Sequence, residues 1–150
     1  MGLDSPSRET RIVSTTTTSV TMTTTNGYRT LQTTGAFSTG VIGPIWIHWN
    51  GVHTYEQGAT NMHVRVLVKY NDGTTAATGD EYQVAKQGMG SNYGFGGHNY
   101  HWVFYNMPVH SNYTVELQGV NQGNAGTTHI SNYFSPGQNN GDKLIVTYNA

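Results

Sequence analysis

The sequence predicts an all-β protein, an antiparallel β-sandwich of jelly-roll type. Only 10% of its 150 residues are charged, against about a quarter in an average globular protein. Nineteen glycines, ten tyrosines and many threonines and asparagines take their place, and these residues are typical of strands and turns. Short alternating apolar segments are separated by Gly, Asn and Pro turns. We therefore expect about eight or nine strands in one domain.

The N-terminal part is polar and rich in threonine. Residues 1–12 look like an arm that precedes the sandwich, which we expect to span residues 13–150. Ser14 to Thr25 holds eight threonines in twelve residues. A disordered stalk is the alternative interpretation, but Thr is β-branched, and the alternation favours a strand. Asn26-Gly27 predicts a turn before a second strand, Tyr28 to Phe37.

The middle of the chain holds the clearest strands. Pro44 to Asn50 places Ile45, Ile47 and Trp49 on one face and Trp46 and His48 on the other, and Gly51 is expected to end it. Met62 to Tyr70 alternates between apolar and polar residues and is followed by the hairpin signal Asn71-Asp72-Gly73. A short strand is expected near Glu81 to Lys86, followed by a glycine-rich loop, Gln87 to Gly97.

The C-terminal third continues the same pattern. Further strands are expected over 99–107, around Tyr113 to Gln118, over 127–134 and over 144–148, with turns between them. The alternating apolar faces predict a buried set. It comprises Val64, Val66, Val68, Val115, Leu117, Leu144 and Val146.

This C-terminal third resembles the trimeric jelly rolls of the tumour-necrosis-factor and complement-C1q type, and the similar domains that decorate phage heads and tip phage fibres. The residues that carry the resemblance are the strand Tyr113-Thr-Val-Glu-Leu-Gln118, the Gly/Asn turn after it, the strand Thr127 to Phe134 and the terminal Leu144 to Tyr148. The resemblance implies a homotrimer with a structural or recognition role.

The composition excludes several classes of function. The chain has no cysteine, which excludes disulfides and thiolate catalysis. Net charge is near zero, so no basic footprint for nucleic acid or a membrane surface is present. No apolar run reaches the length of a membrane helix or resembles a signal peptide. We expect a protein made in the host cytoplasm without a signal peptide.

No motif points to catalysis or to a cofactor. The seven histidines form no His-x-His pair, and His98 and His101 fall on opposite faces of a strand. A trimer axis could still gather three copies of one histidine around an ion. Asp80 and Glu81 face opposite ways and are expected to be solvated charges. The Gly-x-Gly loop is followed by a strand instead of a helix, which argues against a phosphate site.

Exposed aromatic residues are the main candidates for function, because aromatics are enriched in interfaces and stack on sugars. We expect a virion protein on the capsid surface, a trimeric head-decoration or cement protein that binds the major capsid protein and stabilises the head. The alternative is a receptor- or carbohydrate-binding tip module of a phage tail fibre, with glycan loops around Tyr93 or Tyr133. The interface candidates are Arg8, Arg11, Ile12, Trp46, Tyr93, Phe95, Tyr100, Tyr105 and Tyr133.

Overall fold

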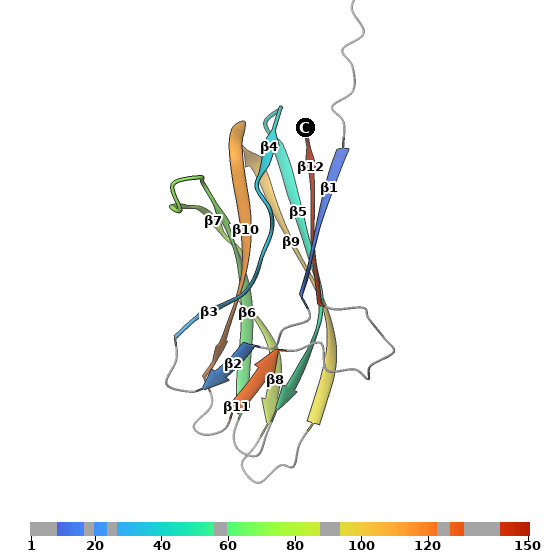
Figure 1. Cartoon of the computed structure of the whole chain (residues 1–150), viewed down its shortest axis with the longest axis vertical. Coiled ribbons are helices and arrows are strands. Elements are labelled where there is room, and N and C mark those ends of the chain that lie inside the picture. The colour runs from blue at the N-terminus through green and yellow to red at the C-terminus, as the bar shows by residue number, and fades with distance from the viewer. Residues whose placement is uncertain are drawn as a thin grey trace, which may run out of the picture.

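The structure is a computed structural model that describes residues 9–16, 20–23, 27–55, 60–87, 94–122, 127–130 and 142–150. Within these ranges the chain forms strands and no helix, and the strands make two antiparallel sheets that face each other (Figure 1). The predicted all-β sandwich is confirmed. Consistently, this part of the chain contains no helix of the length and hydropathy needed to cross a membrane.

The first sheet, sheet A, is built around the long strand β5. Its order is β1, β12, β5, with β9 on the other side of β5 and with β11 and β2 continuing beside the far end of β5. The strand bounds are β1 (Glu9–Thr16), β2 (Val20–Thr23), β5 (Gly43–Tyr55), β9 (Gly94–Met107), β11 (Thr127–Ile130) and β12 (Asp142–Asn149).

The second sheet, sheet B, is built around β10 and β6, which pair over eight residues. Strands β3 and β4 lie beside β10, and β7 and β8 lie beside β6. The strand bounds are β3 (Arg29–Thr33), β4 (Phe37–Thr39), β6 (Thr60–Lys69), β7 (Thr75–Thr78), β8 (Tyr82–Gln87) and β10 (His110–Asn121).

The core lies between the sheets and follows the predicted alternation. All seven aliphatic residues predicted to be inward-facing are 0% exposed. Three residues of β5, Ile45, Ile47 and Trp49, complete the core from sheet A, as their spacing predicts. Because strand side chains alternate between faces, these assignments also fix which residues of β5, β6, β10 and β12 point to solvent.

An aromatic cluster closes the sandwich between β8 and β9. The Tyr82 and Tyr100 rings stack with centroids 4.8 Å apart, and Tyr82 lies 5.2 Å from Trp102. The Tyr82 hydroxyl donates to the His101 carbonyl at 3.0 Å, and the Trp102 indole N–H donates to the Asp80 carbonyl at 2.7 Å. Each buried ring therefore has a backbone partner for its polar atom, and the two sheets are joined on this side.

Several predicted strand limits need correction. Gly51 does not end β5, which continues to Tyr55. A side chain at Gly51 would collide with the Trp49 ring, so the glycine allows that ring to lie over the strand. The segment Ser14 to Thr25 contributes to two strands, β1 and β2, and Tyr28 to Phe37 to two others, β3 and β4. Strand β7 was not predicted, because Thr75–Thr78 carries only small and polar side chains.

The start of the sandwich also lies earlier than predicted. Residues 9–12, assigned to an N-terminal arm, belong to β1 and pair with β12 from Glu9 opposite Asn149 to Ile12 opposite Val146. Ile12 packs against the core. The sheet therefore begins at or before Glu9 and not at residue 13, while residues 1–8 of the proposed arm lie outside the described residues.

Candidate docking and binding surfaces

The two outer faces of the sandwich differ in chemistry. The exposed large hydrophobic residues of the described chain all lie on sheet A or at one end of the sandwich. They are Val13, Val41, Ile42, Trp46, Val103, Tyr105 and Val109. The outer face of sheet B instead carries polar side chains that bind one another. An apolar gathering on one side of a soluble protein indicates an interaction surface there.

Sheet B is centred on a buried ion pair. Glu116 on β10 is 7% exposed and contacts the Lys69 ammonium group on β6. The same carboxylate accepts hydrogen bonds from the Thr30 hydroxyl at 2.5 Å and from the Gln118 amide at 2.8 Å. Burial on its own would raise the pKa of Glu116, but these hydrogen bonds and the Lys69 charge together hold it below its usual value. The carboxylate is therefore ionised and satisfied.

A second polar cluster on sheet B surrounds His63. Its Nδ1 lies 2.9 Å from Glu81, and its Nε2 lies 2.9 Å from the Asn61 side-chain oxygen. Burial lowers the pKa of His63. Glu81, predicted to be a solvated charge, thus has a specific partner. Arg65 is also engaged, because it donates to Gln118 at 3.0 Å and lies over the Tyr28 ring.

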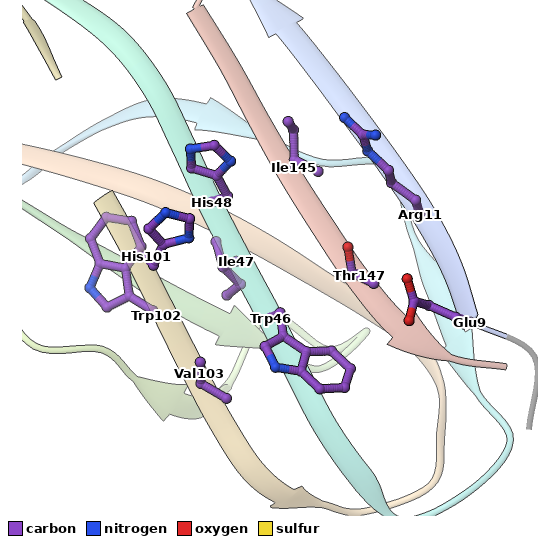
Figure 2. A pocket seen from close by; sticks show the side chains of 10 residues that line it. All are labelled: Glu9, Arg11, Trp46, Ile47, His48, His101, Trp102, Val103, Ile145 and Thr147. Carbon is purple, nitrogen blue, oxygen red and sulfur yellow. The ribbon is translucent and has the colours of Figure 1, made fainter. Parts of the chain in front are cut away.

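On the outer face of sheet A, side chains from four neighbouring strands form rows of cross-strand partners. One row across the sheet contains Arg11, Thr147, Trp46 and Val103, and the next contains Val13, Ile145, His48 and His101. A groove of about 400 Å³ lies over these rows and is bounded by Glu9 and Arg11 on β1 (Figure 2). Its lining combines apolar side chains with His48, His101 and Thr147, and ligand sites likewise combine apolar surface with a few polar groups.

Two histidines lie side by side in this groove. His48 and His101 are cross-strand partners, and their rings stack with centroids 4.3 Å apart and planes 13° apart. His48 Nε2 lies 2.5 Å from the Asn99 side-chain oxygen. The pair presents a flat, rigid surface next to Trp46.

A second exposed apolar surface lies at the end of the sandwich where β9 turns into β10. We call it the apolar end, and it consists of Val41, Ile42, Tyr105 and Val109. Strand pairing brings the two loops together, since Gly43 lies opposite Met107 and Thr39 lies opposite His110. Ile42 is 69% exposed and Tyr105 is 72% exposed. Figure 1 shows the C-terminus at this same end.

The predicted interface residues fall into four groups. Arg11 and Trp46 lie in the groove, and Tyr105 lies at the apolar end. Ile12 and Tyr100 are half-buried and pack against the core, so they support the interior more than an interface. Arg8, Tyr93, Tyr133 and the side chain of Phe95 lie outside the described residues, as do the glycan loops predicted around Tyr93 and Tyr133.

Sequence reasoning missed the histidine pair. It compared histidines along one strand, whereas His48 and His101 meet across β5 and β9 through their register. Each lies on the outward face of an aromatic strand, which is the only local signal. No group of three or more His, Asp or Glu residues suited to a metal ion occurs in the described part of the chain.

Comparisons with known proteins place the fold. No protein-family model and no curated protein matches the chain. Three solved structures of infectious bursal disease virus are similar. The VP2 subviral particle gives a TM-score of 0.66 at 14% identity, covering 99% of this chain and 37% of that one. The structure of the Gx strain has a TM-score of 0.63 at 14% identity, and the match covers 99% of this chain and 36% of that one. The virus-derived T=1 particle has a TM-score of 0.60 at 14% identity, and the match covers 99% of this chain and 35% of that one.

This likeness concerns the fold. The chain spans little more than a third of the length of these viral proteins. Their sequences differ from it at most positions, yet almost the whole chain superposes on one part of each. The chain therefore has the β-sandwich fold of a segment within virus-particle proteins.

Proposed function

We propose that the chain is a structural protein of a virion: a non-enzymatic head-decoration or cement protein that binds the capsid as a trimer. The observation that carries the proposal is the similarity of almost the entire chain, at a TM-score of 0.66, to a VP2 protein whose solved forms are virus-derived particles. Fold likeness alone does not determine function. The surface chemistry provides separate support.

The apolar end is suited to docking on another protein. Four large apolar side chains are exposed there, three from two loops and Tyr105 from the end of β9, and a contiguous apolar group on a protein surface usually marks an interface. The backbone beneath it is held by hydrogen bonds. The Pro108 carbonyl accepts from the Thr39 hydroxyl at 3.2 Å and from the Tyr113 hydroxyl at 2.8 Å. A preorganised surface loses little conformational entropy on binding.

The outer face of sheet B complements this role. Lys69 is paired with Glu116 there, and His63 contacts Glu81. A net charge of −1 gives copies of the chain little mutual repulsion. Many copies that bind only the assembled shell would stabilise it by mass action. On this proposal the protein is located on the virion surface, most simply of a bacteriophage, after synthesis in the host cytoplasm.

Two measurements test the proposal. Size-exclusion chromatography with light scattering should give a trimer, and purified protein should co-sediment with capsids that lack it. Ile42→Asp and Tyr105→Asp should each weaken capsid binding at least tenfold, about 1.4 kcal/mol. Their melting temperatures should change little, because both side chains are exposed.

The matched control is Thr78→Asp, an exposed position on β7 of sheet B. It introduces the same charge away from the apolar end and should leave capsid binding unchanged. A monomer that does not co-sediment with capsids would contradict the proposed function. Equal loss of binding in all three variants would contradict the assignment of the apolar end.

A further inference from the structure

The groove over sheet A has the size and form of a small-ligand site. Its volume is about 400 Å³, within the roughly 300–1,000 Å³ of typical ligand pockets. It is shallow and open, and its walls come from β1, β12, β5 and β9 (Figure 2). Each wall belongs to a sheet whose inner face is the packed core, so the groove exists before any ligand arrives.

The middle of the groove contains aromatic rings. Trp46 is 37% exposed, although tryptophan is usually buried. The stacked His48 and His101 rings lie one row away. Thr147, a short side chain, separates Trp46 from Arg11 across the sheet. An aromatic ring beside a short polar side chain suits a pyranose ring. The C–H face of the sugar packs on the aromatic ring, and its hydroxyls reach the polar neighbours.

One cationic side chain in the groove, Arg11, can bind an anion. Arg11 and Glu9 are the charged side chains that line the groove, and Lys143 lies outside it, further along β12 on the same face. The imidazole pair adds hydrogen-bonding groups and no negative charge. The planar guanidinium of Arg11 can bind a carboxylate through two parallel hydrogen bonds. The guanidinium of Arg11 thus lies in the same groove as Trp46.

We propose that this groove binds a carboxylated glycan. A pyranose ring packs on Trp46, and its carboxylate pairs with Arg11. Glu9 and Thr147 are placed on the same side of the groove and bind sugar hydroxyls. This activity goes beyond the proposed structural role. The groove is lined by other residues than those of the apolar end, although the two surfaces adjoin on β9, where Tyr105 follows Val103 by two positions. A virion protein with such a site would attach particles to acidic sugars.

The test is titration of the full chain with three probes: 3′-sialyllactose, tri-galacturonic acid and neutral lactose. Histidine ring signals in two-dimensional NMR report binding at His48 and His101. At least one carboxylated probe should bind with millimolar affinity or better and shift both histidines, with at least tenfold weaker binding of lactose. Trp46→Ala and Arg11→Ala should each weaken binding of the acidic probe at least tenfold.

A matched control removes an arginine elsewhere. Arg29→Ala, on sheet B, should bind the probe normally. Trp46→Phe keeps a ring and should retain part of the affinity, which separates ring loss from misfolding. The proposal is overturned if neither acidic probe binds, if lactose binds equally well, or if binding survives in both Trp46→Ala and Arg11→Ala. None of these results bears on capsid binding through the apolar end.

Discussion

Replacing Glu116 by Gln tests whether the buried ion pair stabilises sheet B. The variant keeps the size of the side chain and removes its charge. A hydrogen bond to a charged group contributes about 1.5–3 kcal/mol, and a neutral one about 0.5–1.5 kcal/mol. Three groups bind this carboxylate, but the Lys69 side chain is 26% exposed and can return to water. We therefore expect a loss of about 2 kcal/mol, which lowers Tm by roughly 4–8 °C.

Urea denaturation at neutral pH measures this loss, and a double-mutant cycle with Lys69→Met isolates the pair. The coupling free energy should be about 1–2 kcal/mol, within the range for contacting residues. The pH dependence has a fixed sign. Because the folded pKa of Glu116 lies below its ordinary 4.5, the charge contribution is complete above that value and is lost as the pH falls through the folded pKa. A coupling energy under about 0.3 kcal/mol would refute the reasoning. So would a difference in stability between the wild type and Glu116→Gln that persists below the folded pKa of Glu116.

Two further predictions concern packing. Gly79→Ala places a methyl group 2.5 Å from Trp102 Cδ1 and 2.9 Å from Val66 Cγ2, so it should cost about 1–3 kcal/mol; Gly35→Ala, with nothing within 4 Å, should be neutral or slightly stabilising in the same melts. Leu117→Ala, at a fully buried position, should cost about 2–5 kcal/mol, whereas Val109→Ala at the exposed apolar end should stay within about 0.5 kcal/mol. If Gly79→Ala and Gly35→Ala, or Leu117→Ala and Val109→Ala, changed the free energy of unfolding equally, the packing at these positions would have been assigned wrongly.

Much of the fold is predictable because local alternation carries it. The inward apolar residues of β6, β10 and β12 recur at every second position and are buried, although Leu67 and Glu116 on the outer face of sheet B are buried as well. Their inward residues could therefore be named from sequence alone. The turn after β6 is also local, since Asp72 accepts from the Thr74 backbone at 2.8 Å and Gly73 has a φ of 84°. Such features depend on residues that are neighbours in the chain.

The candidate sites are not predictable in the same way. The groove combines β1, β5, β9 and β12, which are distant in sequence and meet only through strand register. A shift of one residue between β5 and β9 would turn His48 and His101 to opposite faces. The sequence also overestimated the arm, because Glu9 to Ile12 look polar until Ile12 is placed against the core. The pairing of distant strands determines the groove, the histidine pair and the start of β1. Local sequence patterns do not specify that pairing.

The three tryptophans report two different events in fluorescence. Trp49 and Trp102 are almost completely buried, and their emission should shift to the red only when the sandwich unfolds. Trp46 is the accessible one, so a soluble quencher such as acrylamide should act on it selectively in the native protein. The chain therefore carries an intrinsic optical probe in the groove and a second one in the core. Ligand occupancy and global unfolding can be followed in one sample without a label.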